Sequence, residues 1–317
     1  MRIGVNPEKS KLSEIKYKQH RIIIPVYIPE SDEEYFQNLF EVLKVCIESI
    51  LKTVDLNNTV ITIINNNCKV EVTDYIETLL INKYIDKHVK YTENYGKVYT
   101  VLAEARASYE DLITITDADV FFFTGWENEI IKAFNTFSKA GVISPLPVPN
   151  LAFYNNTSLF FDKLFSIKKG KIVSNKSFEL FEEGVGNKEV FKKWKNKQFY
   201  LKSGDYPICI GACHFVATYR RSVLQNIEYL KPKYVFKNGY ENKVLDKPID
   251  VLGYYRLSLN KSFAYHLGNN IPKWIENEVG VSSESIDFIE KNKKIIRFSF
   301  MFKKIIAKGI RLIFRSK

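Results

Sequence analysis

The chain has few of the residues that hold small secreted or zinc-dependent folds together. Its 317 residues include four cysteines, which form no CxxC pair and no zinc-ligand spacing. We therefore expect buried free thiols in a reducing compartment, and neither a disulfide framework nor a structural zinc site. The four residues are Cys46, Cys68, Cys209 and Cys213.

Long apolar runs are also missing. The first residues, MRIGVNPEKSKLSEIK, lack the apolar core of a secretory signal. No run approaches the roughly 20 apolar residues that a membrane-spanning helix needs. Hydrophobic residues make up 45% of the chain and charged residues 26%, which is ordinary for a globular protein. We expect a polar leader over residues 1–20 and one large domain over residues 21–290.

Acidic residues are absent from the last segment. Residues 291–317 carry ten Lys or Arg and no acid, so 37 basic residues face 36 acidic ones in the rest of the chain. The tail therefore carries almost all of the net charge of +11. Its apolar residues fall near one face of a predicted helix: Ile295, Phe298, Phe302, Ile305, Ile306, Ile310 and Ile313.

A basic amphipathic helix of this kind is suited to an anionic membrane surface. The alternative is a helix that packs on the body of the protein and leaves a solvated basic face. We do not expect nucleic-acid binding, because the basic residues are confined to the tail and no recognition module accompanies them.

Predicted strands and helices alternate over the first 126 residues. Apolar runs predict strands at 21–29, 59–67, 89–94 and 111–119, and helical periodicity predicts helices at 32–54, 72–85 and 97–108. This alternation is typical of an α/β fold, with a parallel sheet covered by helices on both faces. Ligands bind outside the carboxyl ends of the strands in such sheets.

The pattern is less regular after residue 126. It predicts a helix at 127–140, a strand that runs into a proline-rich loop at 141–150, and irregular structure over 150–205. One or two strands and the start of a helix follow at 206–225. A helix is expected in the second half of 247–259, and a strand and turn at 262–269.

Two carboxylates follow the fourth predicted strand, in the stretch DLITITDADVFFFTGW. Residues i and i+2 of a strand point to the same side, so Asp117 and Asp119 would face one point. Two hard oxygen donors there would hold Mg²⁺ or Mn²⁺. A solvated loop at the end of the strand is the alternative.

Five stretches resemble successive blocks of the family 2 glycosyltransferases of the GT-A fold. They are RIIIPVYIP, CIESIL, VITIINNN, ENYGKVYTVLAEARA and LITITDADVFF. The resemblance covers about residues 21–126 and returns more loosely over 206–270. It implies a nucleotide-sugar-binding half at 21–126, an acceptor-side half at 127–290, and a Mn²⁺ or Mg²⁺ cofactor.

The resemblance also assigns binding residues. Asp117 and Asp119 match the motif that binds the metal and the diphosphate, and His266 stands where many of these enzymes place a histidine near them. An asparagine run, Asn65 to Asn67, replaces the aspartate that usually contacts the base. The other residues implied at the donor site are Pro25, Tyr27, Glu30, Asn94, Gly96, Lys97 and Arg106.

The acceptor side needs a base. Inverting transfer requires a group that takes the proton of the acceptor hydroxyl, and the family places it six residues before an arginine. Asp250 stands six before Arg256, and Asp246 is the second candidate. The alternative for Asp250 is a helix cap. Gly211 and His214 lie in the stretch that resembles the acceptor strand.

The expected activity is metal-dependent, inverting transfer of a sugar from a UDP- or GDP-sugar to a glycan or lipid-linked acceptor. Together with the basic tail, this activity suggests a cytoplasmic protein that lies at the inner face of the membrane. Its expected role there is surface polysaccharide or lipooligosaccharide synthesis. One alternative is a non-catalytic sugar-binding scaffold on a decayed glycosyltransferase fold. The other is a sugar-phosphate nucleotidyltransferase, which would need a glycine-rich, arginine-containing loop where this chain has PVYIPESDEE.

Overall fold

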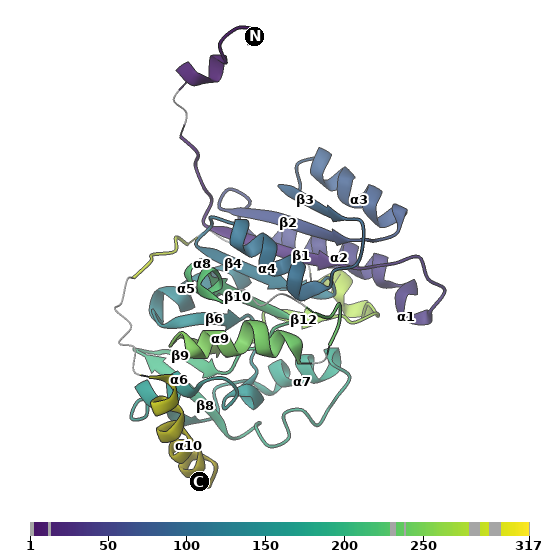
Figure 1. Cartoon of the computed structure of the whole chain (residues 1–317). Helices are drawn as coiled ribbons and strands as arrows, with labels where there is room; N and C mark the ends of the chain where they lie inside the picture. The colour runs from purple at the N-terminus through teal and green to yellow at the C-terminus, as the bar shows by residue number, and fades with distance from the viewer. Residues whose placement is uncertain are drawn as a thin grey trace.

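A ten-stranded sheet forms the centre of the molecule (Figure 1). The structure is a computed structural model, and it describes residues 3–11, 14–228, 233–237, 239–278, 286–291 and 299–316. The strand order is β3-β2-β1-β4-β10-β6-β11-β9-β8-β7, and β5 pairs with β12 in a separate ribbon. The strands are β1 (His20–Val26), β2 (Thr59–Asn66), β3 (Lys87–Tyr91), β4 (Leu112–Thr116), β5 (Val120–Phe122), β6 (Ala140–Ser144), β7 (Lys168–Gly170), β8 (Gln198–Ser203), β9 (Tyr206–Ile210), β10 (Val216–Arg220), β11 (Tyr255–Ser258) and β12 (Ala264–His266).

Helices cover both faces of this sheet. The α-helices are α1 (Glu34–Gln37), α2 (Leu39–Thr53), α3 (Val70–Ile81), α4 (Lys97–Ala107), α5 (Trp126–Thr136), α6 (Thr157–Asp162), α7 (Asn175–Gly184), α8 (Arg221–Asn226), α9 (Lys247–Val251) and α10 (Phe300–Ser316). Short 3-10 or π turns are η1 (Pro7–Ser10), η2 (Pro149–Leu151), η3 (Asn242–Asp246) and η4 (Lys273–Asn277).

The apolar run of β1 shows why this arrangement forms. Side chains alternate along a strand, so Ile22 and Ile24 pack into the core on the α2 side and Ile23 packs into the core on the α4 side. All three are fully buried. Burial of each side chain stabilises the fold by roughly 1.5–3 kcal/mol, which accounts for a continuous apolar run rather than an alternating one.

The direction of the strands agrees with the predicted fold. β3, β2, β1 and β4 run parallel, β10 lies antiparallel between β4 and β6, and β11 runs parallel to β6. The predicted α/β fold of the GT-A type, with a mostly parallel sheet flanked by helices, is confirmed. The four cysteines are free thiols, and all except the partly exposed Cys68 are buried.

Three local predictions need correction. The helix expected at 32–54 is interrupted at Asn38, which separates α1 from α2. The helix expected in the second half of 247–259 is wrong: α9 ends at Val251, Gly253 turns the chain at a φ of 89°, and β11 follows between β6 and β9. Tertiary pairing here overrides local preference. The region 150–205 also holds regular elements, namely α6, α7, β7 and β8.

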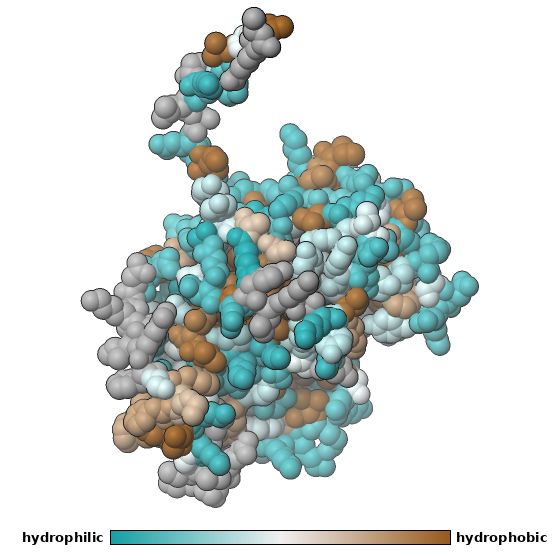
Figure 2. Space-filling model, in the orientation of Figure 1, coloured by the Kyte–Doolittle hydropathy of each residue, from teal (hydrophilic) through white to brown (hydrophobic). Residues whose placement is uncertain are grey.

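Helix α10 packs on α6 through part of its surface. Ala307 and Ile310 are buried, and Lys303 lies 3.7 Å from Asp162. The opposite side is open, and Figure 2 shows hydrophobic side chains gathered over this helix. The exposed apolar residues are Met301, Phe302, Ile305 and Ile306. Ile295 and Phe298 of the predicted apolar face lie outside the described residues. None of the described helices is both long and apolar enough to cross a bilayer.

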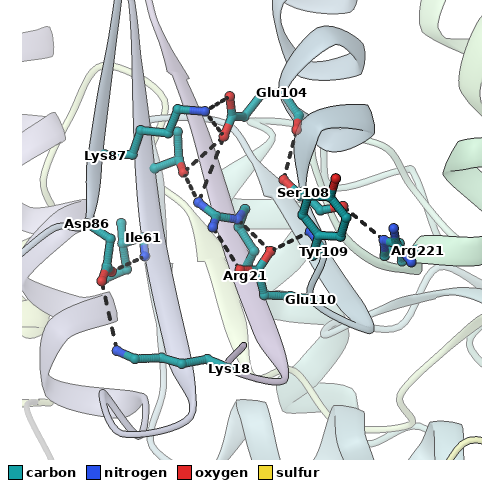
Figure 3. Close-up of polar contacts among 11 residues, drawn as sticks. Lys18, Arg21, Ile61, Asp86, Lys87, Glu104, Ser108, Tyr109, Glu110 and Arg221 are labelled. Carbon is teal, nitrogen blue, oxygen red and sulfur yellow. Dashed lines mark hydrogen bonds and ion pairs between the residues drawn. The ribbon is translucent and has the colours of Figure 1, made fainter. Parts of the chain in front are cut away.

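A charge network closes the amino-terminal edge of the parallel strands (Figure 3). Arg21 donates two hydrogen bonds of 2.8 Å to the Glu110 carboxylate and one of 2.6 Å to Thr62. Lys87 lies 2.9 and 2.7 Å from the two oxygens of Glu104. Burial raises the pKa of Glu110, but Arg21 lowers it more, so that the net pKa lies below its ordinary value. This edge is therefore internally paired.

Candidate active site

The two aspartates lie at the opposite edge, in a turn between β4 and β5. They follow the last residue of β4, Thr116, and are not part of the strand, so the argument from strand alternation does not apply to them. The backbone N–H of Asp117 donates to the Phe215 carbonyl over 2.7 Å, which ties the turn to the end of β10. Both carboxylates nevertheless line the same cavity.

Pairing of β5 with β12 brings His266 to this turn. His266 is opposite Val120 in the ribbon, and the N–H of Leu267 donates to the Asp119 carbonyl over 2.7 Å. The imidazole Nε2 consequently lies 3.5 Å from Asp119 Oδ2. The sequence predicted that His266 would lie near the aspartates. The structure brings His266 and Asp119 together, although they are 147 residues apart in the sequence.

The donor set at Asp119 fits a divalent cation. His266 Nδ1 lies 3.1 Å from the Gly184 carbonyl, so a neutral ring donates there and turns its Nε2 lone pair toward Asp119. The other oxygen of that carboxylate, Oδ1, is buried and has no hydrogen-bond partner among the described residues. Burial raises the pKa of Asp119 to about 6. Two acceptors that face each other, and one orphaned buried oxygen, would be satisfied by a cation.

No complete metal shell is formed by the protein alone. Within the described part of the chain, no three His, Cys, Asp or Glu side chains are grouped closely enough to hold an ion. At most two of Asp117, Asp119 and His266 are therefore close enough to share one ion, and a cation there would take its other ligands from a bound molecule or water.

Lys97 connects Asp117 to the segment that precedes β10. Its ammonium forms an ion pair with Asp117 Oδ1 and donates to the His214 carbonyl over 3.3 Å. Burial lowers the pKa of Lys97, but the Asp117 carboxylate raises it more, so the net pKa lies above its ordinary value. The side chain is a fixed positive charge beside the two acids.

The cavity above these residues has a volume of about 560 Å³, within the range of small-molecule sites. Seven residues predicted at the site line it: Pro25, Tyr27, Asn94, Gly96, Lys97, Asp117 and Asp119. Asn66 of the predicted asparagine run lines it as well. The walls also include residues that the sequence analysis did not select: Tyr35, Phe36, Leu39, Val42, Val235 and Phe236. These carry no motif, and they come from segments far apart in the chain.

Of the three residues in the asparagine run, Asn66 lines the cavity, whereas Asn65 and Asn67 do not. Its amide donates to Asn94 Oδ1 over 2.7 Å and its oxygen accepts from the Tyr95 N–H over 3.0 Å, which joins β2 to the turn before α4. Asn65 points elsewhere, because its side chain bonds Thr73 and the Cys68 N–H. Asn67 is exposed at a φ of 68° and does not line the cavity.

Glu30 and Arg106 are not brought to the cavity either. Glu30 lies exposed in the loop after β1. Arg106 is in the last turn of α4, nine residues from Lys97, which places them about 13 Å apart along the helix. Its guanidinium donates to the Ile227 carbonyl over 2.8 Å. The predicted contact between Arg106 and a diphosphate is therefore wrong.

Gly211 does not provide space for a substrate. It adopts a φ of +123°, and an added Cβ would lie 2.5 Å from the Val148 carbonyl oxygen and 3.1 Å from the Ala152 nitrogen. The chain's own backbone therefore occupies the space beside it, and the predicted acceptor role is corrected to a packing role.

Of the two candidate bases, Asp250 is used as a helix cap. Its two oxygens accept from the N–H groups of Thr157 and Ser158, over 2.8 and 2.7 Å, at the start of α6. Asp246 instead forms an ion pair with Arg256 and lies 3.3 Å from His214 Nδ1. Arg256 is therefore paired with Asp246 and not with Asp250, because the short α9 and the turn after it bring Asp246 to the arginine.

The sequence of this chain matches a known protein family. The sequence profile of the family described as Glycosyl transferase family 2 matches residues 22–228. No curated protein is similar enough to count as a match. Among solved structures, the mannosyltransferase PcManGT from Pyrobaculum calidifontis in complex with GDP-Man and Mn2+ is 12% identical, with a TM-score of 0.44, and the alignment covers 80% of this chain and 59% of that one.

A second solved structure, S. aureus TarS 1-349, is 11% identical, with a TM-score of 0.47, over 78% of this chain and 60% of that one. The chain thus spans about 60% of the length of each of these two structures. The family match covers most of the sheet and both aspartates of the turn. The chain belongs to glycosyl transferase family 2.

Proposed function

We propose that this chain is a metal-dependent, inverting glycosyltransferase that uses a nucleotide-sugar donor. One observation carries the proposal: a buried Asp119 oxygen without a partner lies on a cavity of about 560 Å³ at the carboxyl ends of parallel strands, beside Asp117 and Lys97. A nucleoside diphosphate with a divalent cation would satisfy these groups together.

Each part of the cavity suits one part of such a donor. Tyr27, Tyr35 and Phe36 offer aromatic and apolar surface for a nucleoside. Asp119, together with Asp117 or His266 and oxygens of the donor, would hold Mn²⁺ or Mg²⁺, which would neutralise charge on the leaving diphosphate. Lys97, already held by Asp117, supplies a second positive charge at the same place. The base would be Asp246 or a residue in contact with it, because both oxygens of Asp250 already accept hydrogen bonds at the start of α6.

A panel of UDP-, GDP- and CMP-sugars tests the donor class. A donor that binds the native state raises the unfolding temperature by mass action, and we expect this rise to need Mn²⁺ or Mg²⁺ for one nucleotide class. Donor consumption should follow the same preference. Metal-independent binding of every sugar, without turnover, would favour a non-catalytic binding protein instead.

We further propose that α10 holds the protein at an anionic membrane surface, where a lipid-linked acceptor would lie. Ile305 is 71% exposed and Met301 is 72% exposed, and Lys304 and Lys308 on the same helix are exposed as well. Apolar residues with flanking lysines are typical of interfacial helices. The inner face of a cell membrane carries the required negative charge.

Substitutions on the exposed side of α10 test the membrane proposal without unfolding the helix. Ile305→Ser with Met301→Ser removes apolar area but leaves Ala307 and Ile310 packed on α6. We expect weaker binding to vesicles that contain anionic lipid, and no change in donor consumption in solution. Unchanged vesicle binding would refute the membrane role and leave the donor proposal standing.

A further inference from the structure

A buried acid and an exposed histidine form a linked pair beside the donor cavity. Asp246 is 1% exposed and is held by Arg256, which is itself fully buried and donates to the Ala212 carbonyl. The second oxygen of Asp246 lies 3.3 Å from His214 Nδ1. The side chain of His214 is 40% exposed. Only the histidine end of this chain of contacts reaches solvent.

The chemistry of the contact fixes the state of the ring. A carboxylate accepts hydrogen bonds, so Nδ1 of a neutral His214 must carry the hydrogen and donate it to Asp246. The lone pair is then on Nε2, for which no partner is found among the described residues. An imidazole oriented in this way by a buried carboxylate is the arrangement of a general base.

His214 is also tied to the donor side. Its carbonyl accepts from Lys97, which pairs with Asp117, and the next residue, Phe215, accepts from the Asp117 N–H. The ring of Phe215 lies 5.1 Å from that of His266. The backbone of His214 is therefore anchored to the same groups that would hold the diphosphate.

Asp246 and Asp250 are poor candidates for direct contact with an acceptor. Both are 1% exposed, and all four carboxylate oxygens already have partners within the protein. Proton transfer by either acid would require its network to open. His214 needs no such opening.

We propose that His214 is the catalytic base of this site, with Asp246 and Arg256 as positioning residues. This rests on the proposed glycosyl transfer. Nε2 takes the proton of the acceptor hydroxyl, and the hydroxyl oxygen uses that electron pair to bond to the anomeric carbon. The bond from that carbon to the diphosphate oxygen breaks, and the nucleoside diphosphate leaves with its electrons. The imidazolium then returns the proton to solvent.

The test uses a nucleophile that carries no proton. With the donor identified by the panel, water is the acceptor for wild type, and His214→Gln should lower donor consumption by about 10²- to 10⁴-fold. The glutamine amide can still donate to Asp246, so the fold should persist. Sodium azide should restore consumption in His214→Gln and yield a glycosyl azide, because an anion needs no base.

Two further variants sharpen the outcome. Asp246→Asn should lower turnover while the metal-dependent thermal shift with nucleoside diphosphate stays unchanged, since a merely structural defect would reduce both. His88→Gln on β3 is the matched control and should behave as wild type. The donor KM of His214→Gln should change little, because the residue does not hold the donor.

Three results would overturn the role of His214. They are unchanged turnover in His214→Gln, equal azide rescue of Asp119→Asn, and loss of donor binding in His214→Gln. A wild-type protein that binds but consumes no donor would instead overturn the proposed function, and the assignment of the base would fall with it.

Discussion

The two edges of the parallel sheet differ in how the oxygens of their carboxylates are paired. At the amino-terminal edge, Glu110 is held by the guanidinium of Arg21, and its pKa lies below the ordinary value. At the carboxyl-terminal edge, one oxygen of Asp119 has no partner within the described part of the chain, and burial raises the pKa of Asp119 to about 6. Both oxygens of the carboxylate at one edge are thus hydrogen-bonded, whereas the carboxylate at the other edge keeps one unpaired oxygen.

The difference separates a structural network from a binding site. A buried acid that is fully paired stabilises the fold against loss of its partner. A buried acid that is not paired costs stability unless a ligand completes it. Substitutions at the first edge should therefore change stability and spare chemistry, and those at the second should do the reverse.

The largest effect is expected from Arg21→Met. This change leaves Glu110 buried without its cation, and loss of one partner of a buried pair costs about 3–5 kcal/mol. Urea unfolding should show the loss, while donor consumption per folded molecule stays at the wild-type value. A large fall in turnover without loss of stability would break the distinction between the two edges.

Asp119→Asn should lower turnover by about 10²- to 10³-fold, the scale found when one electrostatic group is removed from an active site. Its free energy of unfolding should stay level or rise, because the negative charge that includes the buried, unpaired oxygen Oδ1 is removed. Parallel assays of donor consumption and thermal unfolding measure both. A marked loss of stability would mean that Asp119 is paired within the fold.

Gly96→Ala should produce a smaller effect on donor binding. Gly96 has a φ of +77°, and a Cβ there would overlap the carbonyl of Val235, which belongs to the cavity wall. With a ψ of 157°, this backbone conformation is essentially confined to glycine, and the strain alone costs about 1–3 kcal/mol. We expect donor affinity to fall about tenfold, equivalent to about 1.4 kcal/mol.

Gly186→Ala is the matched control for that change. Gly186 has a φ of +65°, but a Cβ would meet nothing within 4 Å. It should show a smaller loss of stability, because no backbone overlap is added to the strain, and unchanged donor affinity in the same titration. Equal losses of affinity in both variants would show that the Val235 contact does not shape the cavity.

The smallest expected effect is a change in how the free energy of unfolding depends on pH under acidic conditions. The folded pKa of Glu110 is lowered, so its stabilising contribution is complete above the unfolded pKa, about 4.3, and is lost as pH falls through the folded pKa. Glu110→Gln should be less stable than wild type at pH 7 and should lose less stability between pH 5 and 3. Unfolding free energies across that range measure the slope, and a slope equal to wild type would contradict the assignment.

The sequence predicted well those parts that depend on local pattern. Strands β1, β2 and β4, and the turn with Asp117 and Asp119 after β4, were visible because a parallel strand buried on both faces reads as a continuous apolar run. Asn65, Asn66 and Asn67 could not be ranked in the same way, because strand alternation decides which amide meets the cavity.

Long-range contacts account for the main errors. Asp250 was favoured by spacing, yet the turn at Gly253 brings Asp246 to Arg256 instead. Gly211 was assigned to a substrate, whereas the backbone at Val148 fills the space. Val235 and Phe236 carry no motif, so only the fold reveals them as walls of the cavity.

Calorimetric titration of nucleoside diphosphates, with and without Mn²⁺, tests the central claim most directly when wild type is compared with Asp119→Asn. The site predicts that UDP or GDP binds wild type much more tightly with Mn²⁺ than without it, and that Asp119→Asn removes this difference. Equal metal dependence in the two proteins would contradict a metal-bound diphosphate at this turn.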